Sequence, residues 1–546
     1  MRPMRLSAVC GAFAALLCCT ACVDIDYRLG ENLVPGNQMY NIYTAETPVT
    51  EIELRHTESL SGYSSRRITL GAIRDKDFGL STRACAFTLV PIDKNISFGD
   101  DPEFVSFHLS AELDTVSVRD AAQRNIIQNL RVYELARPIN TKKDRGGIED
   151  FPHLDKSIVR GTPVINGTDS LSLDFTEEFG KRFLELRSED LDSAAYFNKF
   201  PGIYIEAEEP VGMGGRISIF DLQLNYDSSY GYFDGNFALM QTRGTYDGER
   251  KDTMFLFLLG ADNFYDKDSL LTNSATGKFP EFALNISKHE SVPVLQSAEG
   301  NIMVEGGGGN KPVLSAAYLR EISQKIIADK IREKGDYPEE AIDDILQDVI
   351  INKATLVMPF EVPDNYGLFA QVLSPTLRYT YEDEAAFMSI TDATVSEENQ
   401  GDISKALLCY MPDITYHLQA ILDQTEENVN SGNYDIWLMI KAYETLTTNT
   451  STQSINDYNT QLAYQNYYYQ MYGGYGGYGY GGYGGGYNDY YSNYYYYNML
   501  NSASASTSST TTQLMLDQDR YYCTVLNGFN AGRSPSLRLV FSVPMD

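Results

Sequence analysis

The sequence offers few residues with the chemistry and spacing of a catalytic site. Its five histidines are scattered, without the HExxH spacing of a zinc protease, and there is no GxSxG turn of a serine hydrolase. They are His56, His108, His153, His289 and His417. Neighbouring carboxylates are frequent, but among 74 acidic residues such pairs are typical of a solvated surface. We predict no catalytic residue, no metal site and no cofactor, with a hydrolase whose residues meet only in space as an open alternative.

A second kind of chemistry is indicated by cysteines at the N-terminus. Arg2 and Arg5 precede an apolar stretch, 6–17, that is too short to span a bilayer, and small residues then lead to Cys22. This order is typical of a bacterial lipoprotein signal, in which the cysteine after the cleavage point is acylated. We predict a signal peptide over residues 1–21 and palmitate-type lipidation at Cys22. Cys19 is the second choice, and an ordinary secretory signal is the alternative.

The segment after the cysteine indicates where the protein resides. Residues 22–48 are predicted to form the lipid anchor and an N-terminal tether, with Asp24 and Asp26 close to the lipid. Acidic residues at this place resemble the surface-export signal of Bacteroidetes lipoproteins. We therefore expect an outer-membrane, lipid-anchored protein exposed at the cell surface. The formal net charge of −31 argues against nucleic acid as a partner, because phosphate binding needs a positive surface.

The folded part of the chain alternates between apolar and polar residues with period two, which is typical of half-buried antiparallel strands. The clearest examples are 105–113, 171–175 and 537–543. We predict a mainly β protein with two antiparallel β-sandwich, jelly-roll-like domains, over 49–236 and 237–546. Helical spacing over 315–334, followed by Pro338 and a second apolar face to Val349, predicts a small αα-hairpin within 314–350. A short helix is also expected over 413–423.

A low-complexity stretch interrupts the second domain. Residues 464–497 hold 16 of the 40 tyrosines, interleaved with glycine, and a Ser/Thr run follows. Because glycine loses the most backbone entropy on ordering, we predict a disordered loop over 450–513. Its tyrosines are candidates for stacking on sugars or other polymers, with a flexible spacer as the alternative. The candidate binding residues are Tyr472, Tyr475, Tyr478 and Tyr483. The lone tryptophan, Trp437, stands inside an apolar run and is predicted to be core.

Five segments follow one another in a recognisable order: CVDIDYRLGENLVP (22–35), LGAIRDKDFGLSTRACAFTLV (70–90), QNLRVYEL (128–135), FNKFPGIYIEA (197–207) and IINKATLVMP (350–359). In this order they resemble a family of uncharacterised Bacteroidetes lipoproteins, the domain of unknown function 4270. The glycine-rich turn expected before the last segment is present as VEGGGGNKPVL (304–314). The resemblance implies an outer-membrane lipoprotein with β-sandwich character and no enzymatic activity.

Two functions are therefore expected. The first is a non-catalytic structural or protein-interaction component, held to the lipid bilayer by its acyl anchor and accessory to an outer-membrane assembly or transport complex. An outer-membrane protein would then be its partner. The second is a carbohydrate- or polymer-binding surface protein, with a glycan as its ligand through the tyrosine tract.

Overall fold

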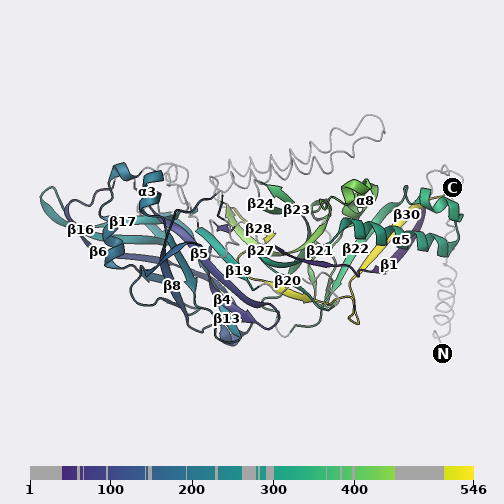
Figure 1. Ribbon diagram of the computed structural model, residues 1–546, viewed down its shortest axis with the longest axis horizontal. Helices are drawn as coiled ribbons and strands as arrows, with labels where there is room; N and C mark the ends of the chain where they lie inside the picture. Colours follow the sequence, from purple (N-terminus) through teal and green to yellow (C-terminus); the bar gives the residue numbers. More distant parts are fainter. Residues whose placement is uncertain are drawn as a thin grey trace, which may run out of the picture.

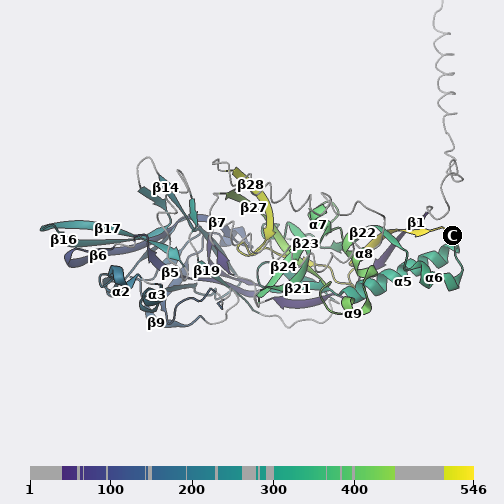
Figure 2. The same cartoon turned by 90° about the horizontal axis from the view of Figure 1, so that it is seen from above.

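The computed structural model describes residues 40–545, apart from 449–508, 261–277, 291–299 and the shorter gaps 58–61, 65–66, 94–95, 142, 145–150, 192, 228–231, 281–282, 364–365, 382–383 and 396–399. The described chain is mainly β, with antiparallel ladders in every sheet, and the predicted fold class is confirmed. Figures 1 and 2 show an elongated body in which strands from distant parts of the sequence lie side by side. No described helix is long and apolar enough to cross a membrane.

One half of the body, the β5 half, is built on a fourteen-stranded sheet system whose main path runs β10-β8-β12-β5-β17-β16-β6-β11. Its strands are β3 (Tyr63–Ser64), β4 (Arg67–Asp75), β5 (Gly79–Pro91), β6 (Asp100–Ala111), β7 (Leu113–Ser117), β8 (Gln128–Leu135), β9 (His153–Ser157), β10 (Val164–Ile165), β11 (Leu171–Asp174), β12 (Ile203–Ala207), β13 (Gly214–Asp221), β16 (Phe237–Tyr246), β17 (Glu249–Gly260) and β19 (Ala283–His289). The small sheet β15-β14-β18 (Tyr232–Gly235, Gln223–Asp227, Lys278–Pro280) is separate from this path.

The other half, the β22 half, contains a five-stranded and a six-stranded sheet together with a two-stranded ribbon. The five strands, in spatial order, are β1 (Tyr40–Pro48), β30 (Ser536–Pro544), β22 (Ile350–Pro359), β26 (Cys409–Tyr410) and β25 (Ile403–Ser404). The six are β2 (Glu53–Thr57), β21 (Gly309–Leu314), β27 (Ile436–Thr448), β23 (Val372–Tyr381) and β24 (Glu384–Ser389), with β28 (Ser509–Leu516) on β27. The ribbon pairs β20 (Ile302–Glu305) with β29 (Cys523–Leu526).

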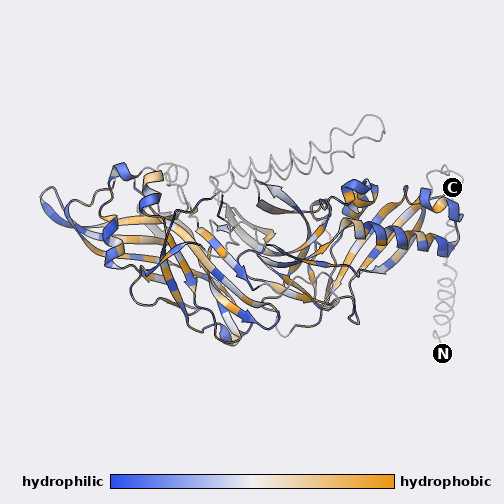
Figure 3. Cartoon of the chain, in the orientation of Figure 1, coloured by the Kyte–Doolittle hydropathy of each residue, from blue (hydrophilic) through white to orange (hydrophobic). Residues whose placement is uncertain are grey.

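Each half has its own apolar core. In the β5 half, Phe107 packs against Phe175, Phe183 and Phe257 with ring centroids 5.0–5.2 Å apart, at the distances that aromatic pairs prefer. In the β22 half the core lies between the sheets and the helices, with Leu319 among its buried residues. Figure 3 shows hydrophobic and hydrophilic bands along the strands, the pattern that period-two alternation predicts.

The helices are short except for α5. They are α2 (Glu177–Phe183), α3 (Ser193–Lys199), α5 (Ala316–Lys334), α6 (Ile342–Ile345), α7 (Asp392–Val395), α8 (Thr415–Asp423) and α9 (Glu426–Val429), with 3-10 turns η3 (Ala121–Gln123), η4 (Ser188–Asp190) and η5 (Glu339–Ala341). The side chain of Ser315 caps α5 by accepting from the backbone N–H of Tyr318 at 3.1 Å, and Gly335 ends the helix with φ of 69°. The predicted helix over 315–334 is confirmed, and so is the one within 413–423.

Two expectations differ from the structure. The second helix of the expected αα-hairpin is shorter than the apolar spacing to Val349 indicates: it comprises only η5 and α6, and the chain from Ile350 onward pairs with β30 as a strand. The boundary expected at 236/237 does not separate the sheets either. β16 pairs with β6 and β17 with β5, while β1 pairs with β30. The two halves therefore exchange segments, so a single point along the sequence cannot divide them.

Candidate functional site

A cluster of ionisable side chains lies where the two halves meet. β5 and β19 bring residues from the β5 half, while β20, β21 and the 517–522 segment before β29 bring residues from the β22 half. Beside it, Leu368 and Tyr521 pack on Ile73, Ile217 and Ile219 across the junction. We call the polar group the junction cluster; its members are Ser81, Arg83, His289, Glu305, Lys311, Asp517 and Tyr521. These side chains are buried, and Arg83 and Lys311 are among the largest fully buried ones.

The glycine-rich turn between β20 and β21 lets these segments approach one another. Gly307 and Gly309 have φ values of 67° and 84°, which side chains with a Cβ rarely adopt. A Cβ on Gly306 would lie 2.2 Å from the Asp517 carboxylate, so no larger residue fits without displacing that loop. The 304–314 turn therefore brings Glu305 and Lys311 to opposite ends of one tight bend beside Asp517.

His289 lies at the centre of the cluster, where its imidazole contacts a carboxylate, a hydroxyl and a guanidinium. Its Nδ1 lies 2.9 Å from Oε1 of Glu305, which assigns the imidazole proton to Nδ1 as donor. The hydroxyl oxygen of Ser81 lies 3.4 Å from the same Nδ1, and Nη1 of Arg83 lies 3.4 Å from Nε2. Serine, histidine and a carboxylate thus come together from β5, β19 and β20.

This arrangement is not that of a hydrolytic triad. A triad places the carboxylate on one imidazole nitrogen and the nucleophile on the other, so that a proton can leave the serine through the free nitrogen. Here Ser81 and Glu305 are both on the Nδ1 side, and Nε2 faces the guanidinium of Arg83. The hydroxyl of Ser81 instead donates to the hydroxyl of Tyr521 at 2.9 Å. In this geometry Ser81 has no general base placed to accept the proton of its hydroxyl.

The charges of the cluster compensate one another. Burial lowers the pKa of His289 to about 4, so the imidazole is neutral at pH 7. Burial also lowers the pKa of Lys311 to about 8; its ammonium donates to the carbonyls of Glu305 and of Gly308, the latter at 2.8 Å. Burial favours a protonated Glu305, but His289 and the N–H of Asn310 hold the pKa of that carboxyl below its ordinary value. Buried cations and anions of this kind are stable only in pairs.

Asp517 closes the cluster from the β22 half. Its carboxylate accepts from the backbone N–H groups of Tyr522 at 2.7 Å and Arg520 at 3.0 Å, which shapes the 517–522 loop. Burial raises the pKa of Asp517 to about 6. The guanidinium of Arg83 lies 5.4 Å from the ring centroid of Tyr521. The two hydrogen bonds shape the loop, and the contact between Arg83 and Tyr521 fastens it to β5.

The thiol of Cys523, which follows the 517–522 segment, is also unreactive. Burial raises the pKa of Cys523 to about 12, so the reactive thiolate is not formed at neutral pH. Nη1 of Arg119 contacts its Sγ, and Nε of Arg119 pairs with Asp75 at 2.7 Å. Cys85 and Cys409 are buried and free as well.

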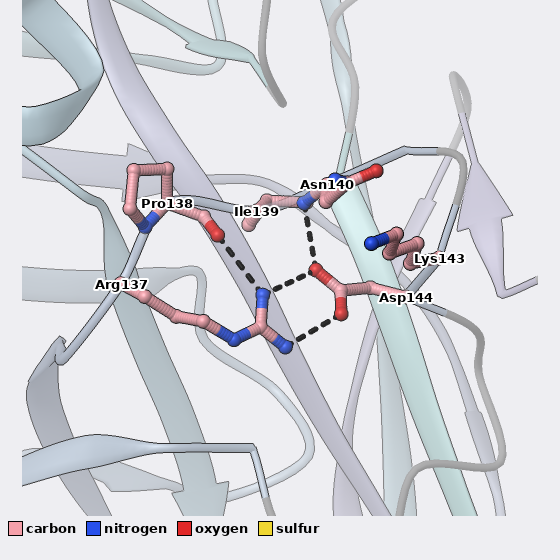
Figure 4. Close-up of a pocket in the computed structure, with 6 residues that line it drawn as sticks. All are labelled: Arg137, Pro138, Ile139, Asn140, Lys143 and Asp144. Carbon is pink, nitrogen blue, oxygen red and sulfur yellow. Dashed lines mark hydrogen bonds and ion pairs between the residues drawn. The ribbon is translucent and has the colours of Figure 1, made fainter.

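A separate pocket of about 490 Å³ lies in the loop after β8 (Figure 4). Arg137 forms a two-pronged ion pair with Asp144, at 2.8 and 2.6 Å, and the same carboxylate accepts from the N–H of Asn140 at 2.7 Å. Nη1 of Arg137 also donates to the carbonyl of Pro138 at 3.0 Å. These charges neutralise each other within the loop, which indicates a self-closed turn in preference to a reactive site.

The residues singled out from the sequence have the following places. Cys22, Cys19 and the tyrosines Tyr472, Tyr475, Tyr478 and Tyr483 lie outside the described residues. Trp437 is 6% exposed and packs on Phe387, so the core prediction is confirmed. In the described part of the chain, no group of three or more His, Cys, Asp or Glu side chains is arranged to hold a metal ion. The junction cluster was missed because its members are up to 440 residues apart and share no local motif.

No family model, no curated protein and no solved structure matches this chain. Its function must therefore be inferred from its own geometry and from the sequence features described above.

Proposed function

We propose that the protein is a non-catalytic, lipid-anchored protein of the outer membrane, exposed at the cell surface, with a structural or protein-interaction role. In this proposal Cys22 carries the acyl chains, and the β body interacts with an outer-membrane protein partner. The tether, expected over 22–48, is shorter than expected because Tyr40–Pro48 forms strand β1 of the body. An accessory role in an assembly or transport complex fits this description. The order of the N-terminal sequence and the resemblance to the lipoprotein family support the anchor.

The observation that carries the non-catalytic part is the environment of His289. Ser81 and Glu305 share one nitrogen of this imidazole, the other nitrogen faces Arg83, and the side chains of His289 and Glu305 are only 2% and 5% exposed. A general base must reach its substrate and have a pKa near the working pH. The burial and the pKa of about 4 are contrary to both conditions. The cluster is better suited to holding the two halves together.

The overall shape supports an extended role for the body. β1, the first described strand, lies at one end of the long axis, and the hairpin of β16 and β17 projects at the other (Figures 1 and 2). The 17 residues between Cys22 and Tyr40 span at most about 60 Å when fully extended. The anchor thus holds the body near the bilayer at the β1 end.

Metabolic labelling with an alkyne palmitate tests the anchor directly. The wild type and Cys19→Ala are expected to take up label, and Cys22→Ala to take up none, because only the cysteine after the cleavage point is acylated. Label that persists in Cys22→Ala and is lost in Cys19→Ala would move the anchor to Cys19. An unlabelled wild type would contradict the lipoprotein proposal.

Purification of the labelled protein in mild detergent tests the interaction role. We expect a defined outer-membrane protein to remain bound in a fixed ratio. A labelled protein that is recovered alone would contradict that role.

A further inference from the structure

Four large apolar side chains are exposed on two loops and the short strand β10, at one edge of the β5 half. We call them the apolar platform: Ile127, Val164, Val211 and Met213. Val211 is fully exposed and Ile127 is 69% exposed, whereas soluble proteins seldom gather such side chains without a purpose. The platform follows β12 and precedes β8 and β13, and β13 lies along the lower side of the body in Figure 1, away from the tip of the β16–β17 hairpin.

Hydrogen bonds and strand register place these three segments together. Val164 is opposite Asn129 in the β10–β8 ladder, so it lies beside the chain that leaves Ile127. The N–H of Glu208 donates to the carbonyl of Asn129 at 2.9 Å, and the Asn129 amide donates to the Glu208 carboxylate at 3.0 Å. These bonds dock the loop that carries Val211 and Met213 against the same strand end.

A buried arginine makes the platform rigid. The guanidinium of Arg216 donates to the carbonyls of Arg124 at 2.7 Å, Ile126 at 2.6 Å and Ile165 at 2.8 Å, and to the hydroxyl of Ser218 at 3.0 Å. Burial lowers the pKa of Arg216 to about 10, which still leaves it charged at neutral pH. One side chain therefore ties the 124–127 and 163–167 loops to β13, and the exposed side chains lose little freedom when they bind.

The turn that carries Val211 and Met213 protrudes from the body. Gly212, between Val211 and Met213, has open space around it, with no heavy atom within 4 Å of the place where a Cβ would lie. A protruding apolar turn needs a receptor that can close around it, and the interfacial zone of a bilayer does so without a preformed hollow.

The charges around the platform suit a lipid surface. Glu208 is paired with Arg131 at 3.2 Å and Glu209 with Arg74 at 3.4 Å, so these two carboxylates have cationic partners although the chain as a whole is strongly negative. Arg124 is exposed and has no ion pair among the residues that the structure describes. A guanidinium at the rim of an apolar patch can reach lipid phosphates while the apolar side chains enter the interface.

We propose that the apolar platform inserts into the interface of the bilayer that carries the anchor, as a second point of membrane contact. This inference rests on the proposed lipid anchor, which keeps the platform at a high local concentration near lipid. A second copy is disfavoured because two chains with a charge of −31 repel each other. Four side chains also cover less than the roughly 800 Å² per partner of a stable interface.

A fluorescent probe on the lipidated full chain tests the insertion. Met213→Cys and Met254→Cys are labelled with a polarity-sensitive, thiol-reactive dye; both methionines are 66% exposed, and Met254 on β17 is the matched control. The described native cysteines are buried. In vesicles of phosphatidylethanolamine and phosphatidylcholine, we expect a blue-shifted emission that brominated lipid quenches severalfold at position 213 and not at 254. Adding Val211→Ser and Ile127→Ser should return the emission at 213 to its value in water.

The other outcomes are separable. If the chain fails to float with the vesicles, the anchor is absent and the proposed function itself fails. If the chain floats and position 213 remains in water, the insertion is overturned and the anchor stands. A blue shift in native outer membranes but not in lipid vesicles would assign the platform to a protein partner and overturn the proposal. A blue shift that appears without lipid would indicate self-association and would also overturn it.

Discussion

The junction cluster and the apolar platform are both held in place by hydrogen bonds, but the cluster is buried and the platform is exposed to solvent. In the junction cluster, groups that could do chemistry, such as His289 and Glu305, are sealed from solvent and paired with each other. In the platform, side chains without chemistry, such as Val211, are held out into solvent. An enzyme usually does the reverse, with reactive groups in an accessible cleft and apolar groups in the core. This difference is what the proposed role, contact through the surface and cohesion through the polar interior, requires.

Each region is organised by a buried arginine, and the two arginines differ in their partners. Arg216 in the platform makes four hydrogen bonds, three of them to backbone carbonyls. Arg83 in the junction cluster donates to the carbonyl of Thr82, lies against the Tyr521 ring, and has no hydrogen-bond acceptor for Nε and Nη2 among the described residues. Its charge is balanced by carboxylates nearby, so the junction depends on charge balance more than the platform does.

The largest effect that would break this comparison is expected at Glu305. Glu305→Gln removes the carboxylate that faces His289 and compensates Lys311 and Arg83, so about 3–5 kcal/mol of unfolding free energy should be lost, as when one partner of a buried pair is removed. Val211→Ser in the platform is the control, and its cost should stay within about 0.5 kcal/mol because the side chain is fully exposed. Denaturation midpoints in guanidinium measure both. Equal losses for the two variants would show that the cluster is not the joint of the body.

A smaller effect concerns pH. The pKa of Asp517 is raised from 3.8 to about 6, so its contribution to stability is fully present below pH 4 and is lost as the pH rises through 6. The pKa of His289 is lowered from 6.5 to about 4, so its contribution is present above pH 6.5 and is lost as the pH falls toward 4. As the pH falls from 6 to 4 in the wild type, Asp517 therefore increases the free energy of unfolding while His289 decreases it.

Asp517→Asn removes the contribution of Asp517 to the pH dependence of stability and leaves that of His289. Relative to the wild type, its stability should fall by up to about 1.4 kcal/mol for each pH unit between 6 and 4, the value of one proton per unit. Denaturation midpoints at pH 6, 5 and 4 give the slope for both proteins. Other buried titrating groups, such as Asp392 and His417, are common to both proteins, so their contributions cancel. Parallel curves would contradict the assigned burial of Asp517.

Much of the local structure could be predicted from the sequence. The alternation over 171–175 places Leu171 and Leu173 in the core and exposes Ser172 and Asp174, as β11 does. Ser315 and Gly335 mark the ends of α5 because a hydroxyl cap and a left-handed glycine have direct chemical causes. The apolar spacing to Val349 was less informative about where the second helix ends: α6 ends at Ile345, and strand β22 begins at Ile350.

Long-range arrangement was beyond reach from the sequence, for physical reasons. A strand's partner is chosen by packing over the whole sheet, so nothing near Phe237 indicates that β16 belongs beside β6. Ser81 and Tyr521 carry no spacing signal because they meet only through the junction of the halves. Val211 and Met213 are exposed on a turn beside Ile127 and Val164, and no local pattern indicates that these distant segments come together.

The central claim, that the polar interior holds the body together and does no chemistry, is tested most directly at His289. The imidazole pKa can be measured by nuclear magnetic resonance on protein with ¹⁵N-labelled histidine, with His289→Gln to assign the signal among five histidines. We expect His289 to remain neutral, with the proton on Nδ1, down to about pH 4. Titration of His289 between pH 6 and 7.5 would contradict the claim, because it would describe an accessible base near the working pH of an enzyme.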